Sequence, residues 1–246
     1  EAEELERLDF LYHRGIANGI KVEKLSPEAA HDIEPYVNCI AAIRVYSTGI
    51  VDYKQVCKAY VKCIESQGNE LRLNAKVHLI RDETNSYFLQ TDSESFQARF
   101  VINCAGLFSD RVAQMLGDRP AAKIVPFRGE YYELTPEKRY LVKNLIYPVP
   151  NPNFPFLGVH LTRMIDGSIH AGPNAVLSLK REGYSKLDFN LRDFSEVMTY
   201  PGFWKLATKY WDEGLQEIVR SFSKKAFLKS VQRLIPDIKT DDLIIS

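Results

Sequence analysis

The sequence predicts a mixed fold, in which an α/β part is followed by an α+β part with an antiparallel sheet and helices. Segments with helical and with strand periodicity alternate up to about residue 117. From residue 124 onwards, short strands follow one another and are separated by turns, and residues 185–235 then carry helical periodicity. At roughly 100–200 residues per domain, these observations predict two domains, which we place at residues 1–122 and 123–246.

The first part opens with helices. Residues 4–17 place apolar side chains at helical spacing and end at an Asn-Gly stop, and Ser26 followed by Pro27 is typical of the start of a second helix. Residues 40–46 predict a strand. Residues 52–66 predict the clearest helix, because Asp52 can cap it and apolar side chains form one continuous face.

A three-stranded meander follows, with strands at residues 71–80, 87–91 and 96–104 and polar turns between them. The third strand ends in the small residues Cys104, Ala105 and Gly106, and a helix follows from about Ser109. Small residues at the carboxyl end of a strand let the backbone approach a ligand closely. An ordinary tight turn between a strand and a helix is the alternative interpretation.

The second part is predicted to be a sheet with helices. A hairpin centred on Asp166-Gly167 joins two of its strands, and a proline-rich loop covers residues 148–155. The helical region is predicted to break near Pro201 and near Phe222, and residues 243–245 have strand character. The predicted strands cover residues 124–134, 145–149, 156–163 and 168–172.

Composition excludes several classes of protein. The chain has 246 residues, and its 32 basic and 32 acidic side chains give no net charge, which argues against a nucleic-acid-binding protein. The 28 aromatic residues and the ordinary charged fraction of 26% argue against disorder, and no apolar run is long enough to cross a membrane. The four cysteines form no metal-binding pattern, so we expect no metal site and we expect reduced thiols in a reducing compartment.

Two strands carry side chains that suggest chemistry. His160 and Thr162 share one strand face with Arg163 at its end, and this trio would suit a small acid whose hydroxyl group must lose a proton. A lone histidine is more often a structural residue, so that alternative stays open. On the strand at residues 124–134, Gly129 faces the same way as Tyr131, which indicates either room for a planar ligand or a glycine that packs beneath an aromatic ring.

Seven segments together resemble one family, the L-2-hydroxyglutarate oxidases and dehydrogenases. This family is a branch of the D-amino-acid-oxidase-like (glycine-oxidase-type) flavoproteins, and the resemblance runs along almost the whole chain in order. The segments are Gly49-Ile50-Val51-Asp52, residues 101–107, residues 126–131, Leu145-Ile146-Tyr147-Pro148, residues 155–167, Gly172-Pro173-Asn174-Ala175 and Lys180-Arg181-Glu182-Gly183-Tyr184.

The resemblance implies an enzyme that uses FAD to oxidise L-2-hydroxyglutarate to 2-oxoglutarate, with oxygen or a quinone as electron acceptor. It implies that residues 1–122 are a partial Rossmann-like FAD domain with interdomain helices. Residues 123–246 would be the substrate domain, which returns toward the FAD domain at its end. The implied roles are catalysis for His160, substrate binding for Tyr131, Thr162 and Arg163, and cofactor binding for Val77, Cys104, Ala105 and Gly106.

The sequence also departs from the family. None of its 13 glycines forms a G-x-G pair, so the glycine turn and helix that receive the pyrophosphate of FAD are absent. On family length we expect roughly a hundred residues to precede this chain and a further segment to follow it. The resemblance implies a cytoplasmic location, with peripheral attachment to the inner membrane left open. An amine-oxidising relative and a non-catalytic substrate-domain module remain the alternatives.

Overall fold

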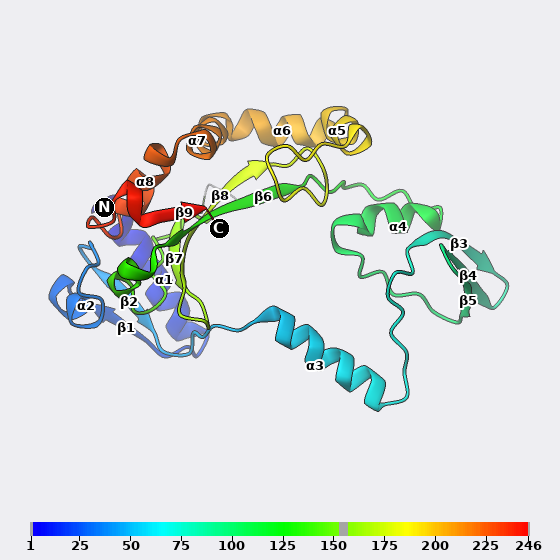
Figure 1. Cartoon of the computed structure of the whole chain (residues 1–246), viewed down its shortest axis with the longest axis horizontal. Helices are drawn as coiled ribbons and strands as arrows, with labels where there is room; N and C mark the ends of the chain where they lie inside the picture. The colour runs from blue at the N-terminus through cyan, green and yellow to red at the C-terminus, as the bar shows by residue number, and fades with distance from the viewer. Residues whose placement is uncertain (1, 153–156, 246) are drawn as a thin grey trace. The chain divides into compact units, whose positions relative to one another are not determined.

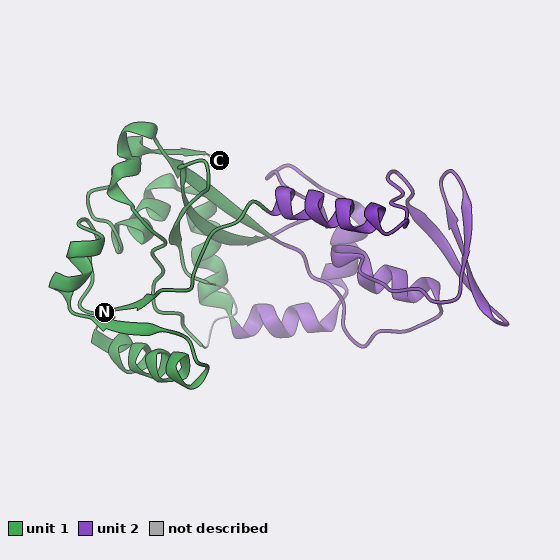
Figure 2. Ribbon diagram, turned by 90° about the horizontal axis from the view of Figure 1, so that it is seen from below, with its two compact units in different colours: residues 1–52, 128–176, 210–246 green, residues 53–127, 177–209 purple. Residues whose placement is uncertain are grey.

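The chain forms two compact units, each assembled from separate stretches of sequence (Figure 2). In this computed structural model the described residues are 2–152 and 157–245. Unit 1 comprises residues 1–52, 128–176 and 210–246, and unit 2 comprises residues 53–127 and 177–209. The division into two consecutive domains, at residues 1–122 and 123–246, stays a prediction.

Unit 1 begins with two helices and a two-stranded ribbon. Helix α1 (Leu5–Ala17) ends at Asn18, and helix α2 (Pro27–Ile33) begins after Ser26, whose hydroxyl accepts a hydrogen bond from the backbone N–H of Ala29 at 3.3 Å. Both helices were predicted from these stop and start residues. Strand β1 (Val22–Leu25) lies between the two helices in the chain, and it pairs antiparallel with strand β2 (Ala42–Val45), which follows α2.

A four-stranded sheet is the centre of unit 1, in the order β7-β8-β6-β9 (Figure 1). Its strands are β6 (Phe127–Leu134), β7 (His160–Arg163), β8 (Ile169–Leu177) and β9 (Leu243–Ile245). Strand β7 pairs antiparallel with β8, and β6 pairs antiparallel with β9. The strand character of the last residues is therefore confirmed.

Four strand predictions for this part of the chain were wrong in extent. The strand expected at residues 145–149 is only an isolated bridge from Ile146 to Leu161, because the prolines that follow cannot donate to a ladder. Strand β6 begins at Phe127 rather than at residue 124, and β8 runs on to Leu177 rather than ending at residue 172. Strand β7 begins at His160, and the predicted residue Phe156 lies outside the described residues, as do residues 153–155 of the predicted proline-rich loop.

The predicted hairpin joins β7 and β8 through a loop of three residues. The backbone N–H of Met164 donates to the carbonyl of Ser168 at 2.8 Å, which closes the loop over residues 165–167. Gly167 adopts a φ of 83° there, a conformation that glycine reaches without strain. This loop sets the register in which Thr162 lies directly opposite His170.

The hydrophobic core of unit 1 lies between one face of the sheet and helix α8 (Lys224–Gln232), which follows helix α7 (Trp211–Phe222) in the chain. Phe227 of α8 is 1% exposed, and its ring lies 4.7 Å from that of Tyr132 on β6. Leu161 of β7 is also fully buried in this core. Because side chains alternate along a strand, the neighbours of Leu161 lie on the opposite face of the sheet.

Unit 2 contains the predicted meander, with strands β3 (Val77–Glu83), β4 (Ser86–Thr91) and β5 (Ser95–Ala98) paired antiparallel. The first strand, predicted at residues 71–80, was wrong in extent, because it begins at Val77 and ends at Glu83. The strand predicted at residues 96–104 was wrong in its second half. After Ala98 the chain forms no strand, and Phe100 and Ile102 are 82% and 86% exposed. A strand needs a neighbour to pair its backbone groups, and no other described strand pairs with residues 99–105.

The helices of unit 2 are α3 (Tyr53–Ser66), α4 (Ser109–Met115), α5 (Leu191–Met198) and α6 (Pro201–Lys209). Helix α3 has the predicted extent, yet none of its residues is buried. The helical region predicted from residue 185 begins only at Leu191, because Asn190 is the N-cap and accepts a hydrogen bond from the N–H of Asp193 at 3.0 Å. The break predicted near Pro201 is confirmed, and the one predicted near Phe222 falls at Ser223.

Two further observations concern the whole chain. All four cysteines are free thiols. Among the described residues, helices are too short and too polar to cross a membrane.

Candidate functional site

His160 lies on the face of the unit 1 sheet that points away from the core. It is 8% exposed, and its Nδ1 lies 3.0 Å from the carbonyl oxygen of Gly158. The ring of Tyr147 stacks on the imidazole, with 4.2 Å between centroids and 21° between planes. Two contacts therefore hold the orientation of this side chain.

The environment of His160 also determines its protonation. Burial lowers the pKa of the imidazole below its usual value of 6.5, although the hydrogen bond to Gly158 partly opposes this effect. The ring is therefore neutral at pH 7. A carbonyl oxygen only accepts hydrogen bonds, so Nδ1 carries the proton and Nε2 presents a lone pair. A neutral imidazole in this tautomer can accept a proton at Nε2.

Three polar side chains share this face with His160. Thr162 lies two residues further along β7, and His170 of β8 lies directly opposite Thr162. The ring of Tyr131 on β6 lies 6.4 Å from that of His170. We call this set (His160, Thr162, His170 and Tyr131) the site face.

Tyr131 is a hydrogen-bond donor at neutral pH. Partial burial, together with the nearby Tyr147, raises the pKa of its phenol above the usual value of 10.0. The hydroxyl therefore keeps its proton and can donate to an anionic or carbonyl oxygen. The site face thus combines a proton acceptor with a proton donor.

Gly129 and Gly172 let two strands approach beneath Tyr131. A Cβ added to Gly172 would lie 2.6 Å from Cδ1 of Tyr131 and 2.9 Å from the carbonyl oxygen of Glu130. A Cβ on Gly129 would lie 3.1 Å from Pro173 and 3.2 Å from the ring of Tyr131. Gly129 therefore packs beneath an aromatic ring, and the interpretation that it leaves room for a planar ligand was wrong.

Arg163 does not join the site face. It follows Thr162 in β7, so its side chain leaves the strand on the other side, and its Nη1 lies 3.5 Å from the carbonyl oxygen of Val142. The structure thus brings His160, Thr162 and Tyr131 together but leaves Arg163 at the end of the strand.

The sequence reasoning missed two members of this region. His170 and Tyr147 contact Tyr131 and His160 respectively, although neither was assigned a role. The hairpin at Asp166-Gly167 could have revealed His170, because a loop of three residues places it opposite Thr162. Tyr147 offered no comparable signal, since it lies outside regular strands and reaches His160 only through tertiary packing.

The residues expected near a cofactor lie in unit 2. Cys104, Ala105 and Gly106 are exposed and lead into a 3-10 turn, Gly106–Phe108. Gly106 adopts a φ of 54°, and a Cβ placed there would meet nothing within 4 Å. Asn103 holds the turn internally, because its amide oxygen accepts from the N–H of Ala105 at 3.2 Å and its Nδ2 donates to the carbonyl of Ser109 at 2.8 Å. The backbone of this turn is therefore exposed, and the hydrogen bonds of Asn103 fix its conformation.

This turn is open to a ligand. Its small, uncovered residues let a ligand approach the main chain, as the sequence suggested. Val77 begins strand β3 of the same unit, next to an irregularity in the pairing with β4, and helix α4 lies beside β3. The chain contains no G-x-G pair that would receive a pyrophosphate.

No metal cluster is present in the part of the chain that the structure describes, meaning no group of three or more His, Cys, Asp or Glu side chains placed to hold an ion. A cleft of about 390 Å³ in unit 1 borders Tyr147 and Gly158, and Arg220 and Arg233 also line it. Both arginines already have acidic neighbours, Glu217 and Glu4. The cleft therefore adds no separate anion site to the site face.

The fold described above is that of FAD-dependent oxidoreductases. The sequence matches the FAD dependent oxidoreductase family over residues 1–239, and the chain belongs to this family. The resemblance identified from the motifs is thereby confirmed.

Several relatives are similar over nearly the whole chain. L-2-hydroxyglutarate dehydrogenase of Indibacter alkaliphilus is 48% identical over 244 residues, which cover 98% of this chain and 61% of that protein. The protein of the same name from Escherichia coli K12 is 42% identical and covers 98% of this chain and 57% of its own length. The human mitochondrial L-2-hydroxyglutarate dehydrogenase is 39% identical, with 99% and 56% covered. The chain thus spans 56–61% of the length of these relatives.

Solved structures agree on the fold. L-alpha-glycerophosphate oxidase from Mycoplasma pneumoniae, with FAD bound, aligns to all of this chain and to 57% of its own, with a TM-score of 0.75 and 21% identity. Glycine oxidase from Geobacillus kaustophilus aligns to all of this chain and 54% of its own, with a TM-score of 0.59 and 16% identity. The predicted combination of helices and antiparallel sheets is therefore the fold of FAD-dependent oxidoreductases.

Proposed function

We propose that the protein containing this chain oxidises L-2-hydroxyglutarate to 2-oxoglutarate and uses FAD to do so. The observation that carries the proposal is the 48% identity, over 98% of the chain, to a protein named L-2-hydroxyglutarate dehydrogenase. The proposal also accounts for the chemistry of the site face, where a proton acceptor and a proton donor lie on one sheet.

His160 is the proposed base of the reaction. Oxidation of a 2-hydroxy acid removes the hydroxyl proton and a hydride from the same carbon, so a base must be ready at neutral pH. The lowered pKa of His160 keeps it neutral, and the bond from Nδ1 to Gly158 directs the lone pair of Nε2 away from that carbonyl. FAD, when bound, accepts the hydride.

Thr162 and Tyr131 are the proposed substrate-binding residues. Thr162 shares the strand face of His160, and its hydroxyl can donate to a carboxylate oxygen. The protonated phenol of Tyr131 can do the same. Arg163, which the resemblance also assigned to the substrate, is the weakest member of this proposal because its guanidinium turns toward Val142.

The proposed cofactor contacts of this chain are Val77 and the turn at Cys104, Ala105 and Gly106. They would offer backbone groups to the cofactor, because the turn is exposed and carries no bulky side chain. The pyrophosphate would be held by residues outside this chain. Oxygen or a quinone is the proposed electron acceptor, and attachment to a membrane surface is left to experiment.

The test is a comparison of substrates with the complete protein. Anaerobic bleaching of the flavin absorbance is measured with L-2-hydroxyglutarate, D-2-hydroxyglutarate, glycine and sarcosine, and steady-state turnover follows with oxygen or a soluble quinone. We expect rapid bleaching with the L-hydroxy acid alone. Bleaching by glycine or sarcosine in its place would support the amine-oxidising alternative and refute the proposal.

A further inference from the structure

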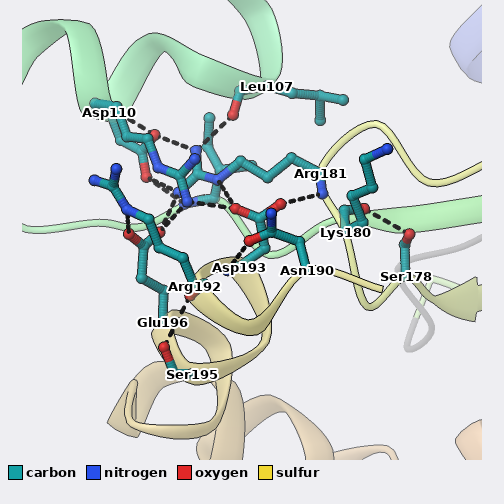
Figure 3. Close-up of polar contacts among 12 residues, drawn as sticks. Leu107, Asp110, Ser178, Lys180, Arg181, Asn190, Arg192, Asp193, Ser195 and Glu196 are labelled. Atoms are coloured by element: carbon teal, nitrogen blue, oxygen red, sulfur yellow. Dashed lines mark hydrogen bonds and ion pairs between the residues drawn. The ribbon is translucent and has the colours of Figure 1, made fainter. Parts of the chain in front are cut away.

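Unit 2 contains a buried set of charged side chains that the proposed function does not use. We call it the Arg181 cluster, and Figure 3 shows most of its polar contacts. Arg181 and Asp110 have side chains that are only 3% and 6% exposed. Its members are Arg111, Arg181, Asp110, Asp193 and Glu196.

Arg181 makes the largest number of contacts in the cluster. Its two terminal nitrogens bind both carboxylate oxygens of Asp110 in a fork, and Nη2 also lies 3.0 Å from Oε2 of Glu196. Its backbone N–H donates to Oδ2 of Asp193 at 2.9 Å. Charges buried this deeply are tolerated only when they are paired and hydrogen-bonded, and this fork meets that condition.

Asp110 is correspondingly held as an anion. Burial by itself would raise the pKa of its carboxyl group, but the hydrogen bonds from Arg181 and from the N–H of Ile124 outweigh burial and lower it. The contact between α4, which carries Asp110, and the segment around Arg181 therefore persists throughout the neutral range of pH.

Arg181 makes one further hydrogen bond, to an uncharged backbone carbonyl. Nη1 also donates to the backbone carbonyl of Leu107 at 2.5 Å, a contact visible in Figure 3. Leu107 is the middle residue of the turn at Gly106–Phe108. Asn103 ties the two ends of this turn, and Arg181 holds its middle from 74 residues away in the sequence.

Arg111 provides the natural comparison within the cluster. Its Nη2 lies 2.5 Å from Asp193 and 2.7 Å from Glu196, and its side chain is 16% exposed. Like Arg181 it pairs with the carboxylates of α5. Unlike Arg181 it has no hydrogen bond to the turn among the contacts of the described residues.

We propose that Arg181 is a positioning residue for the cofactor. Through its hydrogen bond to the Leu107 carbonyl, Arg181 fixes the backbone conformation of the turn at residues 104–107. This inference rests on the proposed function, because it takes the turn to be a contact of FAD. Lysine cannot replace Arg181, because a single ammonium group cannot bind both oxygens of Asp110, Glu196 and the Leu107 carbonyl in one plane. Arg181 would therefore act on FAD binding without touching FAD.

The experiment compares Arg181→Lys with Arg111→Lys in the complete protein. FAD is removed, and its dissociation constant is measured by titrating the apoprotein. We expect Arg181→Lys to weaken FAD binding about tenfold or more and to shift the visible flavin spectrum, since a charge-assisted hydrogen bond is commonly worth that much. Arg111→Lys should change the dissociation constant less than about threefold.

A second readout needs no flavin. The backbone N–H of Phe108 donates to the carbonyl of Ala105 at 2.9 Å inside the turn, and its hydrogen exchange reports how often the turn opens. Exchange of this amide in the apoprotein should be about tenfold faster in Arg181→Lys and unchanged in Arg111→Lys. If Arg181→Lys does not fold, Asp110→Asn takes its place with the same criteria, because it weakens the fork and keeps Arg181.

The outcomes separate the two proposals. Equal FAD affinity in wild type and Arg181→Lys, or the same loss of affinity in both lysine variants, would overturn the positioning role. A wild-type protein that binds no FAD would instead contradict the proposed function. In that case the exchange of the Phe108 amide still decides whether Arg181 holds the turn.

Discussion

Replacement of Phe227 by alanine should destabilise unit 1 by about 4 kcal/mol. Transfer of a phenyl ring back to water costs roughly 1.5–3 kcal/mol. Phe227 is 1% exposed among core side chains that include Tyr132, and a vacated ring space of about 100 Å³ would add about 2 kcal/mol at roughly 24 cal/mol per Å³. Relaxation of the neighbours recovers part of this sum.

Phe222 is the matched control. It has the same side chain on the adjacent helix α7, but it is 80% exposed. Phe222→Ala should change the free energy of unfolding by less than about 0.5 kcal/mol. The assay is urea denaturation of the apoprotein of both variants, and with a slope of about 2 kcal/mol per molar the midpoint of Phe227→Ala should fall by about 2 M. Midpoints that agree within about 0.5 M would refute the argument that this ring is a principal support of the sheet.

Three other predictions follow from the site and its surroundings. His160→Ala should lower kcat/KM for L-2-hydroxyglutarate about 100-fold or more with FAD retained, and an unchanged rate would remove His160 from the site. The wild-type kcat/KM should fall as the pH drops through the pKa of His160, because protonation removes the base. Burial places this pKa below 6.5. The 246-residue chain purified alone should be colourless, since it has no G-x-G pair for the pyrophosphate, and a stoichiometric flavin absorbance band would contradict this. Glu34 is the residue that follows α2, and Glu34→Gln should cost about 1.5–3 kcal/mol of unfolding free energy, because the buried carboxylate accepts from the backbone N–H groups of Lys143 at 3.0 Å and Asn144 at 2.5 Å. Asp32→Asn, at an exposed position within α2, should cost much less.

Local features of the sequence predicted the positions of most elements. Ser26 and Pro27 marked the start of α2, and the meander of β3, β4 and β5 followed from alternation and polar turns. Such features can be predicted from sequence, because a helix cap, a turn or a hydrophobic periodicity depends on residues that are close together in the chain. The Asp166-Gly167 turn even contained the register that brings His170 opposite Thr162.

Predictions failed where a segment depends on distant partners. Residues 99–105 have the apolar character of a strand, but no described strand pairs with them and they form no regular secondary structure. Helix α3 has an apolar face, yet none of its residues is buried. Periodicity shows which face could be buried and does not supply the surface that would cover it.

The candidate site divides in the same way. The sequence by itself determined the family, the pairing of His160 with Thr162 on one strand face, and the small residues of the turn at Gly106, because all three are properties of short stretches of chain. Only the tertiary structure decided that Tyr147 stacks on His160, that burial favours its neutral form, and that the Gly158 carbonyl places the proton on Nδ1. It alone placed Arg181 against Leu107, 74 residues away. Packing brings such groups together, and a pKa depends on the groups around a side chain rather than on its neighbours in sequence.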